Sequence, residues 1–142
     1  MILYLDTSSL VKLYVEEAHS DAVRQWVESA EAVATCRVAY PEMMSALTRR
    51  YNGGDLPREG YETLAECFAG QWEHIVALDF DEIEAGRLVR EYGLRGFDAV
   101  HLAAAKLLSD DNGAVEVAFS SFDKKLNGAA EAEGLAVFAV RE

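Results

Sequence analysis

The sequence has few cysteines and lacks long hydrophobic runs. Cys36 and Cys67 are its only cysteines, they do not form a Cys-x-x-Cys spacing, and a reduced protein is the simplest interpretation. No apolar run approaches the roughly 20 residues that a membrane-spanning helix needs. The first nine residues also lack the basic leader of a signal peptide. We therefore expect a cytoplasmic protein that does not enter a membrane.

Basic residues are also scarce. The chain has 13 Lys and Arg against 25 Asp and Glu, and its formal net charge is −12. Taken alone, this balance argues against non-specific binding of nucleic acid, because phosphate groups are neutralised by Lys and Arg. No repeat, low-complexity tract or Pro/Gly-rich linker divides the 142 residues, so we expect one globular domain over residues 1–142.

Short apolar runs alternate with helical patterns along the chain. We expect strands at residues 2–5, 32–35, 75–78, 115–119 and 136–140. Helices are expected at residues 8–14, 20–30, 41–51 with Pro41 opening the helix, 58–72, 81–92, 98–109 and 124–133. This alternation predicts an α/β fold with a parallel sheet covered on both faces. Sites in such sheets form beyond the carboxyl ends of the strands, where the strand order reverses.

Four carboxylates stand alone in stretches that otherwise lack acids. Asp6 is the only acid in residues 1–15, Glu42 in residues 32–54, Asp98 in residues 92–109 and Asp123 in residues 117–130. Each lies just after a predicted strand or in the first turn of a predicted helix, and in a parallel sheet such positions can converge. Taken singly, each acid could instead be a helix cap or a partner of the helix dipole. That explanation does not account for the absence of other acids around all four of them.

Four carboxylates in one place repel one another and retain protons unless a cation neutralises them. Mg²⁺ and Mn²⁺ are the natural partners, because hard cations prefer oxygen ligands and keep bound waters for chemistry. Such ions activate water and stabilise the leaving oxygen in phosphodiester cleavage. The pattern of acids therefore favours a metal-dependent reaction on a phosphodiester.

Several stretches resemble a known family. They are LDTSSLVKLY at 5–14, YPE at 40–42, GFDAVHLA at 96–103, and SFDKKL at 121–126 followed by Gly134 and Leu135. These stretches resemble the PIN domain and, more narrowly, the VapC-type ribonuclease toxins of toxin–antitoxin pairs. The resemblance extends from residue 1 to about residue 140, and none of the family's motif acids is missing.

The resemblance implies a three-layer α/β/α sandwich with a central parallel sheet and an acidic pocket that binds Mg²⁺ or Mn²⁺. It implies an endoribonuclease that cleaves RNA, forms a homodimer and is blocked by a cognate antitoxin, often through a basic side chain. By match of motif, the catalytic and metal-binding quartet would be Asp6, Glu42, Asp98 and Asp123. Hydroxyls that could support the carboxylates or bound waters would come from Thr7, Ser8 and Ser121.

The distribution of basic residues weakens the objection from net charge. Most of them lie in the same four segments as the isolated acids, so RNA could meet a basic rim around a metal-filled pocket. As candidate phosphate contacts we single out Lys12, Arg49, Arg50 and Lys124. The alternative is that these four residues only keep the surface soluble.

We expect structural roles for His101 and for the aromatic residues of the predicted helices. His101 follows Asp98 by three residues and so shares its helix face, a spacing that could make a metal pair. In an Ala/Leu-rich stretch, however, a packed and hydrogen-bonded histidine is favoured. Aromatic residues at helical spacings, such as Phe68 and Trp72, are expected in the core or a dimer interface.

Three other functions would also use acidic side chains. A phosphotransferase with Asp6 as nucleophile usually has a second Asp two positions on, where this chain has Ser8. A non-catalytic interaction or RNA-binding module would need the four acids only as caps, and a metal-binding measurement would identify it. A receiver-type signalling domain requires an acceptor Asp after its central strand, for which Asp79 is a loose candidate. We rank a Mg²⁺- or Mn²⁺-dependent endoribonuclease above all three.

Overall fold

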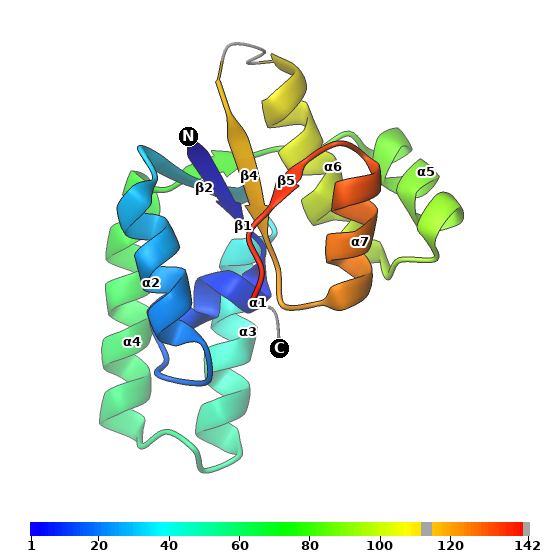
Figure 1. Cartoon of the computed structure of the whole chain (residues 1–142). Coiled ribbons are helices and arrows are strands. Elements are labelled where there is room, and N and C mark those ends of the chain that lie inside the picture. Colours follow the sequence, from blue (N-terminus) through cyan, green and yellow to red (C-terminus); the bar gives the residue numbers. More distant parts are fainter. Residues whose placement is uncertain (112–114, 141–142) are drawn as a thin grey trace.

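A five-stranded parallel sheet lies at the centre of the protein (Figure 1). The computed structural model describes residues 1–111 and 115–140. The strands are β1 (Ile2–Leu5), β2 (Ala32–Cys36), β3 (Val76–Leu78), β4 (Val117–Ser120) and β5 (Ala136–Val137), in the order β3-β2-β1-β4-β5. The chain runs outward from β1 through β2 to β3 and then returns to place β4 on the other side of β1. The strand order therefore reverses between β1 and β4.

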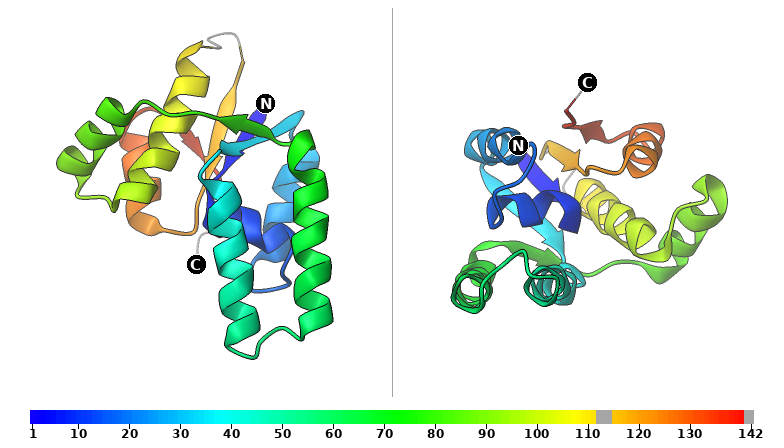
Figure 2. Two further views of the ribbon diagram at one scale, coloured as in Figure 1. Left: turned by 180° about the vertical axis from the view of Figure 1, so that it is seen from behind. Right: turned by 90° about the horizontal axis from the view of Figure 1, so that it is seen from below.

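Helices cover both faces of this sheet (Figure 2). One face carries α1 (Thr7–Leu10), the 3₁₀ turn η1 (Val11–Leu13), α2 (Ser20–Ser29), α3 (Ala39–Asn52) and α4 (Arg58–Gln71), which continues into the 3₁₀ turn η2 (Trp72–His74). The other face carries α5 (Glu82–Tyr92), α6 (Gly96–Asp111) and α7 (Lys124–Ala132). The protein is therefore a three-layer α/β/α sandwich, as the family resemblance implies. None of the helices within residues 1–111 and 115–140 is long and apolar enough to cross a membrane.

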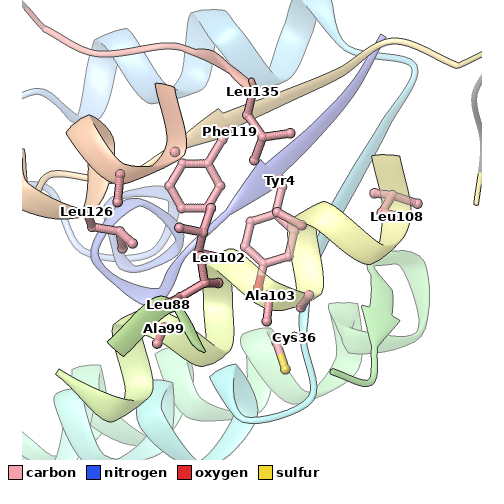
Figure 3. Close-up of a cluster of buried hydrophobic side chains, with 14 of the residues drawn as sticks. Tyr4, Cys36, Leu88, Ala99, Leu102, Ala103, Leu108, Phe119, Leu126 and Leu135 are labelled. Atoms are coloured by element: carbon pink, nitrogen blue, oxygen red, sulfur yellow. The ribbon is translucent and has the colours of Figure 1, made fainter. Parts of the chain in front are cut away.

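Two hydrophobic cores result from the alternation of side chains along the strands. Leu3 and Leu5 of β1 pack against α1 to α4, while Tyr4 between them packs against α5 to α7. All three are fully buried, as expected for a parallel sheet covered on both faces. Figure 3 shows the core on the face covered by α5 to α7, where Tyr4 and Phe119 lie among side chains of these three helices.

The predicted strands and helices are confirmed, but several boundaries differ. The helix expected to open at Pro41 begins at Ala39, and the one expected from Asp98 begins at Gly96. A proline fits anywhere in a first helical turn, because the first N–H groups of a helix have no partner within it. The Ala99 N–H bonds the Arg95 carbonyl at 3.0 Å, so Asp98 lies inside the first turn of α6.

The first predicted helix and the last predicted strand are shorter than expected. The pattern at 8–14 forms only the four residues of α1 and the 3₁₀ turn η1. The strand predicted to reach residue 140 ends at Val137, although the N–H of Phe138 still bonds the Phe119 carbonyl at 2.8 Å. At both places, apolar character continues beyond the regular backbone hydrogen bonding.

Candidate active site

A pocket of about 1000 Å³ opens beyond the carboxyl ends of β1 and β4, where the strand order reverses. All four isolated carboxylates line it: Asp6 follows β1, Glu42 lies in α3, Asp98 lies in α6 and Asp123 precedes α7. The structure therefore brings together acids that are up to 117 positions apart in the sequence. The topology does this, since parallel strands place the starts of the following helices at one edge of the sheet.

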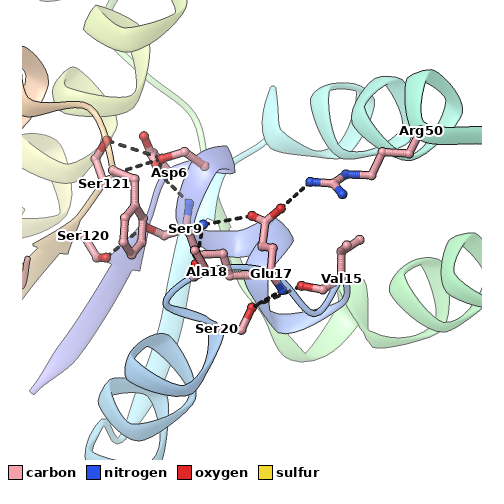
Figure 4. Close-up of polar contacts among 12 residues, drawn as sticks. Asp6, Ser9, Val15, Glu17, Ala18, Ser20, Arg50, Ser120 and Ser121 are labelled. Carbon is pink, nitrogen blue, oxygen red and sulfur yellow. Dashed lines mark hydrogen bonds and ion pairs between the residues drawn. The ribbon is translucent and has the colours of Figure 1, made fainter. Parts of the chain in front are cut away.

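Asp6 is buried at the bottom of this pocket, with 3% of its surface exposed. Its Oδ1 caps α1 by accepting a hydrogen bond from the Ser9 N–H at 3.0 Å (Figure 4). The same oxygen also accepts a hydrogen bond from the Ser8 hydroxyl at 2.7 Å. Burial raises the pKa of Asp6, although His101 and the neighbouring hydroxyls lower it in part. The ionised carboxylate is thus incompletely compensated by the protein.

Glu42 lies half-buried in the first turn of α3. Its Oε1 accepts hydrogen bonds from the Thr7 hydroxyl at 2.7 Å and from His101 Nε2 at 2.8 Å. Burial by itself raises the pKa of Glu42, but the hydrogen bonds from His101 and Thr7 outweigh it and bring the pKa below its usual value. Glu42 is therefore ionised at neutral pH.

Asp98 and Asp123 share one guanidinium group. Arg95 Nε lies 3.2 Å from Asp98 Oδ2, and Arg95 Nη2 lies 3.2 Å from Asp123 Oδ2. The other oxygen of Asp123, Oδ1, caps α7 by accepting the Leu126 N–H at 2.9 Å. The Arg95 side chain is 81% exposed and is held to the pocket by these two contacts. It is a cation at the place where two predicted metal ligands meet.

The three hydroxyls predicted to support the acids all lie at this site. Besides bonding Asp6, the Ser8 hydroxyl accepts the N–H of Phe122 at 3.0 Å. The Ser121 hydroxyl accepts the N–H of Asp123 at 3.0 Å and helps to lower the pKa of Asp6. Together with the bond from Thr7 to Glu42, these contacts tie the loop after β4 to the start of α1.

The structure separates the four candidate phosphate contacts. Arg49 and Arg50 line the pocket, whereas Lys12 and Lys124 do not. Arg50 is ion-paired with Glu17 (Figure 4), and Lys12 Nζ binds the same carboxylate at 2.9 Å, so the two basic side chains share one acidic partner. Arg49 donates to the neutral Ser45 hydroxyl at 2.9 Å and forms no ion pair with the residues that the structure describes.

Sequence reasoning missed Arg95 as a pocket residue and did not find the partners of His101. The signal for Arg95 was present, because residues three apart on a helix lie on one face and Arg95 precedes Asp98 by three. His101 is 2% exposed and bonds Tyr4 and Glu42, which agrees with the expected packed, hydrogen-bonded histidine. Its partners are far away in sequence and leave no local pattern.

The oxygen atoms available to a metal ion can be identified. Asp6 and Asp123 each use one oxygen as a helix cap, and Glu42 uses Oε1 for two hydrogen bonds. Arg95 occupies Oδ2 of both Asp98 and Asp123. Within the described parts of the chain, no three carboxylate, imidazole or thiol groups converge closely enough to form a ready-made metal site. An ion would therefore require the carboxylates to move together, and Arg95 stands between two of them.

Asp79, the acceptor that a receiver-type domain would need, lies outside this pocket. Its side chain is 82% exposed and forms an ion pair with Arg37 at 2.9 Å. Ser8, at the position where a phosphotransferase would have its second Asp, donates a hydrogen bond to Asp6. Neither arrangement supplies the acid that the alternative chemistry requires.

Comparison with known proteins agrees with this architecture. The PIN domain family matches residues 3–132. Ribonuclease VapC45 of Mycobacterium tuberculosis is 31% identical over 139 residues, covering 96% of this chain and 94% of the relative. The crystal structure of FitAcB from Neisseria gonorrhoeae has a TM-score of 0.65 at 18% identity, covering 98% of this chain and 97% of that one. The structure of FitAB bound to the IR36 DNA fragment has a TM-score of 0.63 at 19% identity, covering 100% and 99%. The chain belongs to the PIN domain family.

Proposed function

We propose that this protein is an endoribonuclease, the toxin of a toxin–antitoxin pair, that hydrolyses RNA phosphodiester bonds with Mg²⁺ or Mn²⁺. The observation that carries the proposal is the pocket at the strand-order reversal, which is lined by four carboxylates from four separate segments. The similarity of this chain to proteins named ribonuclease VapC supports RNA as the substrate. The match to the first of these relatives covers 96% of this chain and 94% of the relative.

The donor set fits a hard divalent cation. Every candidate ligand atom is a carboxylate oxygen, which Mg²⁺ and Mn²⁺ prefer over nitrogen or sulfur. The raised pKa of Asp6 indicates a negative charge that a bound cation would stabilise. Asp6, Asp98 and Asp123 would hold the ion directly or through water, and Glu42 would complete the set. When bound, the ion supplies Lewis acidity to activate water and to stabilise the leaving oxygen.

The chain's own residues would orient the reactants. Glu42, ionised and fixed at Oε1, can accept a hydrogen bond from water at Oε2. Arg49, which has no ion pair among the described residues, lies on the α3 wall of the pocket and can bind a phosphate oxygen of the RNA backbone. Thr7, Ser8 and Ser121 hold the carboxylates in place.

We further propose that the protein is a cytoplasmic homodimer controlled by an antitoxin. The acidic pocket would accept a basic side chain of that partner, and the position of Arg95 between Asp98 and Asp123 supports this, because a guanidinium fits there. An arginine from an antitoxin would occupy the same carboxylates that the cation needs, and so would inhibit the enzyme.

The first experiment incubates purified protein with a mixed RNA pool in Mg²⁺, Mn²⁺ or excess EDTA, beside an Asp98→Asn preparation. We expect discrete fragments from the wild type with metal, and none with EDTA or from the variant. Cleavage that resists EDTA would overturn the metal dependence. Equal cleavage by both preparations would show that the activity does not come from this pocket, and absence of both cleavage and metal binding would favour a non-catalytic module.

Removing the guanidinium between Asp98 and Asp123 is expected to tighten metal binding. In an Arg95→Gln variant, the two carboxylates lose a competing cation, so the Kd for Mn²⁺ should fall about two- to tenfold, the range expected for breaking partly exposed ion pairs. Isothermal titration calorimetry measures this change directly.

Arg90→Gln is the matched control for this prediction. Arg90 is an exposed arginine on α5 outside the pocket, so its removal changes the net charge equally without touching either carboxylate. The control should bind Mn²⁺ as the wild type does. Weaker binding by Arg95→Gln would contradict the prediction and show that Arg95 supports the ligands instead of competing with the ion.

A further inference from the structure

The imidazole of His101 connects the segments that carry the acids. Its Nδ1 lies 2.7 Å from the Tyr4 hydroxyl, and its Nε2 lies 2.8 Å from Glu42 Oε1 and 3.3 Å from Thr7 Oγ1. Tyr4 precedes Asp6 by two residues on β1, and His101 lies about one helical turn beyond Asp98 on α6. One side chain therefore joins β1, α1, α3 and α6 beneath the pocket.

The hydrogen bonds define which ring nitrogen carries the proton. An ionised carboxylate can only accept, so Nε2 must donate to Glu42. In a neutral imidazole, Nδ1 is then the acceptor, and the Tyr4 hydroxyl must donate to it. A tyrosine hydroxyl can donate as well as accept, so Tyr4 can fill this role.

The ring is also held rigidly. His101 is 2% exposed and Tyr4 is fully buried. The Tyr4 ring stacks on Phe119 with centroids 5.5 Å apart, and it meets the His101 ring edge-on at 5.9 Å. Because a buried polar side chain without partners is costly, these contacts strongly favour a single ring orientation.

We infer that His101, oriented by Tyr4, is a positioning residue that fixes Glu42 Oε1 and thereby presents Oε2 to the cation or the attacking water. Thr7 and His101 together supply two donors to Oε1. Within the described part of the chain, no hydrogen bond reaches Oε2, and Glu42 lines the pocket. The inference rests on the proposed function, and it gives a role in that function to His101, which is not one of the four acids. The role resembles that of the outer partners that orient metal ligands in proteins generally.

Two conservative variants separate positioning from packing. In His101→Gln, the side-chain amide nitrogen can take the place of Nε2 and still donate to Glu42. In His101→Asn, the amide reaches only as far as Nδ1, so it can contact Tyr4 but not Glu42. Both variants are polar and neutral, and both are smaller than histidine, which makes them a matched pair.

We expect His101→Asn to weaken Mn²⁺ binding about ten- to a hundredfold, the usual cost of losing a partner that orients a metal ligand, and His101→Gln to restore most of it. Titration calorimetry gives the affinities, and thermal unfolding in EDTA verifies that each variant is folded. Tyr4→Phe keeps the stacked ring but removes the hydroxyl, and should give an intermediate affinity. In the metal-free wild type, ¹⁵N NMR should show the tautomer that is protonated at Nε2.

The possible failures are distinguishable when Asp6→Asn is measured in parallel. If folded His101→Asn binds Mn²⁺ like the wild type while Asp6→Asn does not bind, the inference is overturned and the proposed function stands. Equal losses in the Gln and Asn variants, or an Nδ1-protonated ring, would also overturn it. If wild type and Asp6→Asn both fail to bind Mn²⁺, the proposed function falls and this inference falls with it.

Discussion

Replacing Asp6 with asparagine is expected to abolish RNA cleavage and at the same time to make the metal-free protein more resistant to unfolding at neutral pH. Asparagine keeps an oxygen that caps α1 through the Ser9 N–H, so the local backbone is retained. The lost negative charge removes a proposed metal ligand at the bottom of the pocket. Losing about 3 kcal/mol of transition-state stabilisation lowers the rate by at least about a hundredfold.

The expected gain in stability follows from the pKa of Asp6, which burial raises above its ordinary value. The folded state therefore binds this proton more tightly than the unfolded chain, and the free energy of unfolding falls as pH rises from about 4 through the raised pKa. In Asp6→Asn the side chain at this position carries no titrating proton, so this fall in the free energy of unfolding does not occur. The variant's advantage over the wild type should be absent near pH 4 and present near pH 7, as measured by urea unfolding in EDTA at about those two pH values.

Asp79→Asn is the control for both measurements. Asp79 lies outside the pocket with its side chain 82% exposed, so its replacement removes the same charge from a solvated position. Wild-type cleavage and a nearly unchanged free energy of unfolding are expected for it. Cleavage by Asp6→Asn at the wild-type rate would place the chemistry elsewhere, and a loss of stability at neutral pH would mean that the charge of Asp6 is well compensated without metal.

The arrangement of strands and helices could be predicted because the relevant signals are local. The run at residues 2–5 is apolar throughout and ends at Asp6, and β1 ends at Leu5. Boundaries within continuous apolar or helical sequence were less certain, as at Gly96 and Pro41. There the first residues of a helix lack partners within it, so neither proline nor glycine marks the start uniquely.

The gathering of the acids could be anticipated, whereas their electrostatic partners could not. Asp6 and Asp123 occur at strand ends, and the rule for parallel sheets places such ends together. The contacts of His101 depend on how α6 packs against β1 and α3, which no spacing in the sequence expresses. Lys12, a predicted phosphate contact, instead binds Glu17 five residues away, a separation that is not one of the helical three- and four-residue spacings.

The second large effect concerns stability, and we expect it for Phe68→Ala. Phe68 is fully buried, and no other residue of α4 is buried to this extent. Its ring lies 5.3 Å from the Tyr14 and Tyr40 rings and 5.6 Å from Trp72, measured between centroids. Truncation to alanine leaves a cavity and should cost about 3–5 kcal/mol, a large part of the 5–15 kcal/mol that typically stabilises a domain.

This aromatic cluster matters for the site because Tyr40 lies two residues before Glu42 in the first turn of α3. Loss of Phe68 should therefore lower cleavage in proportion to the unfolded fraction, and stabilising conditions such as lower temperature should restore it. Phe97→Ala, at a phenylalanine that is 61% exposed, should change the free energy of unfolding by less than about 0.5 kcal/mol. If the two variants unfolded at the same urea concentration, α4 would not be anchored through Phe68. If folded Phe68→Ala lost Mn²⁺ binding, the cluster would control the geometry of Glu42 as well as stability.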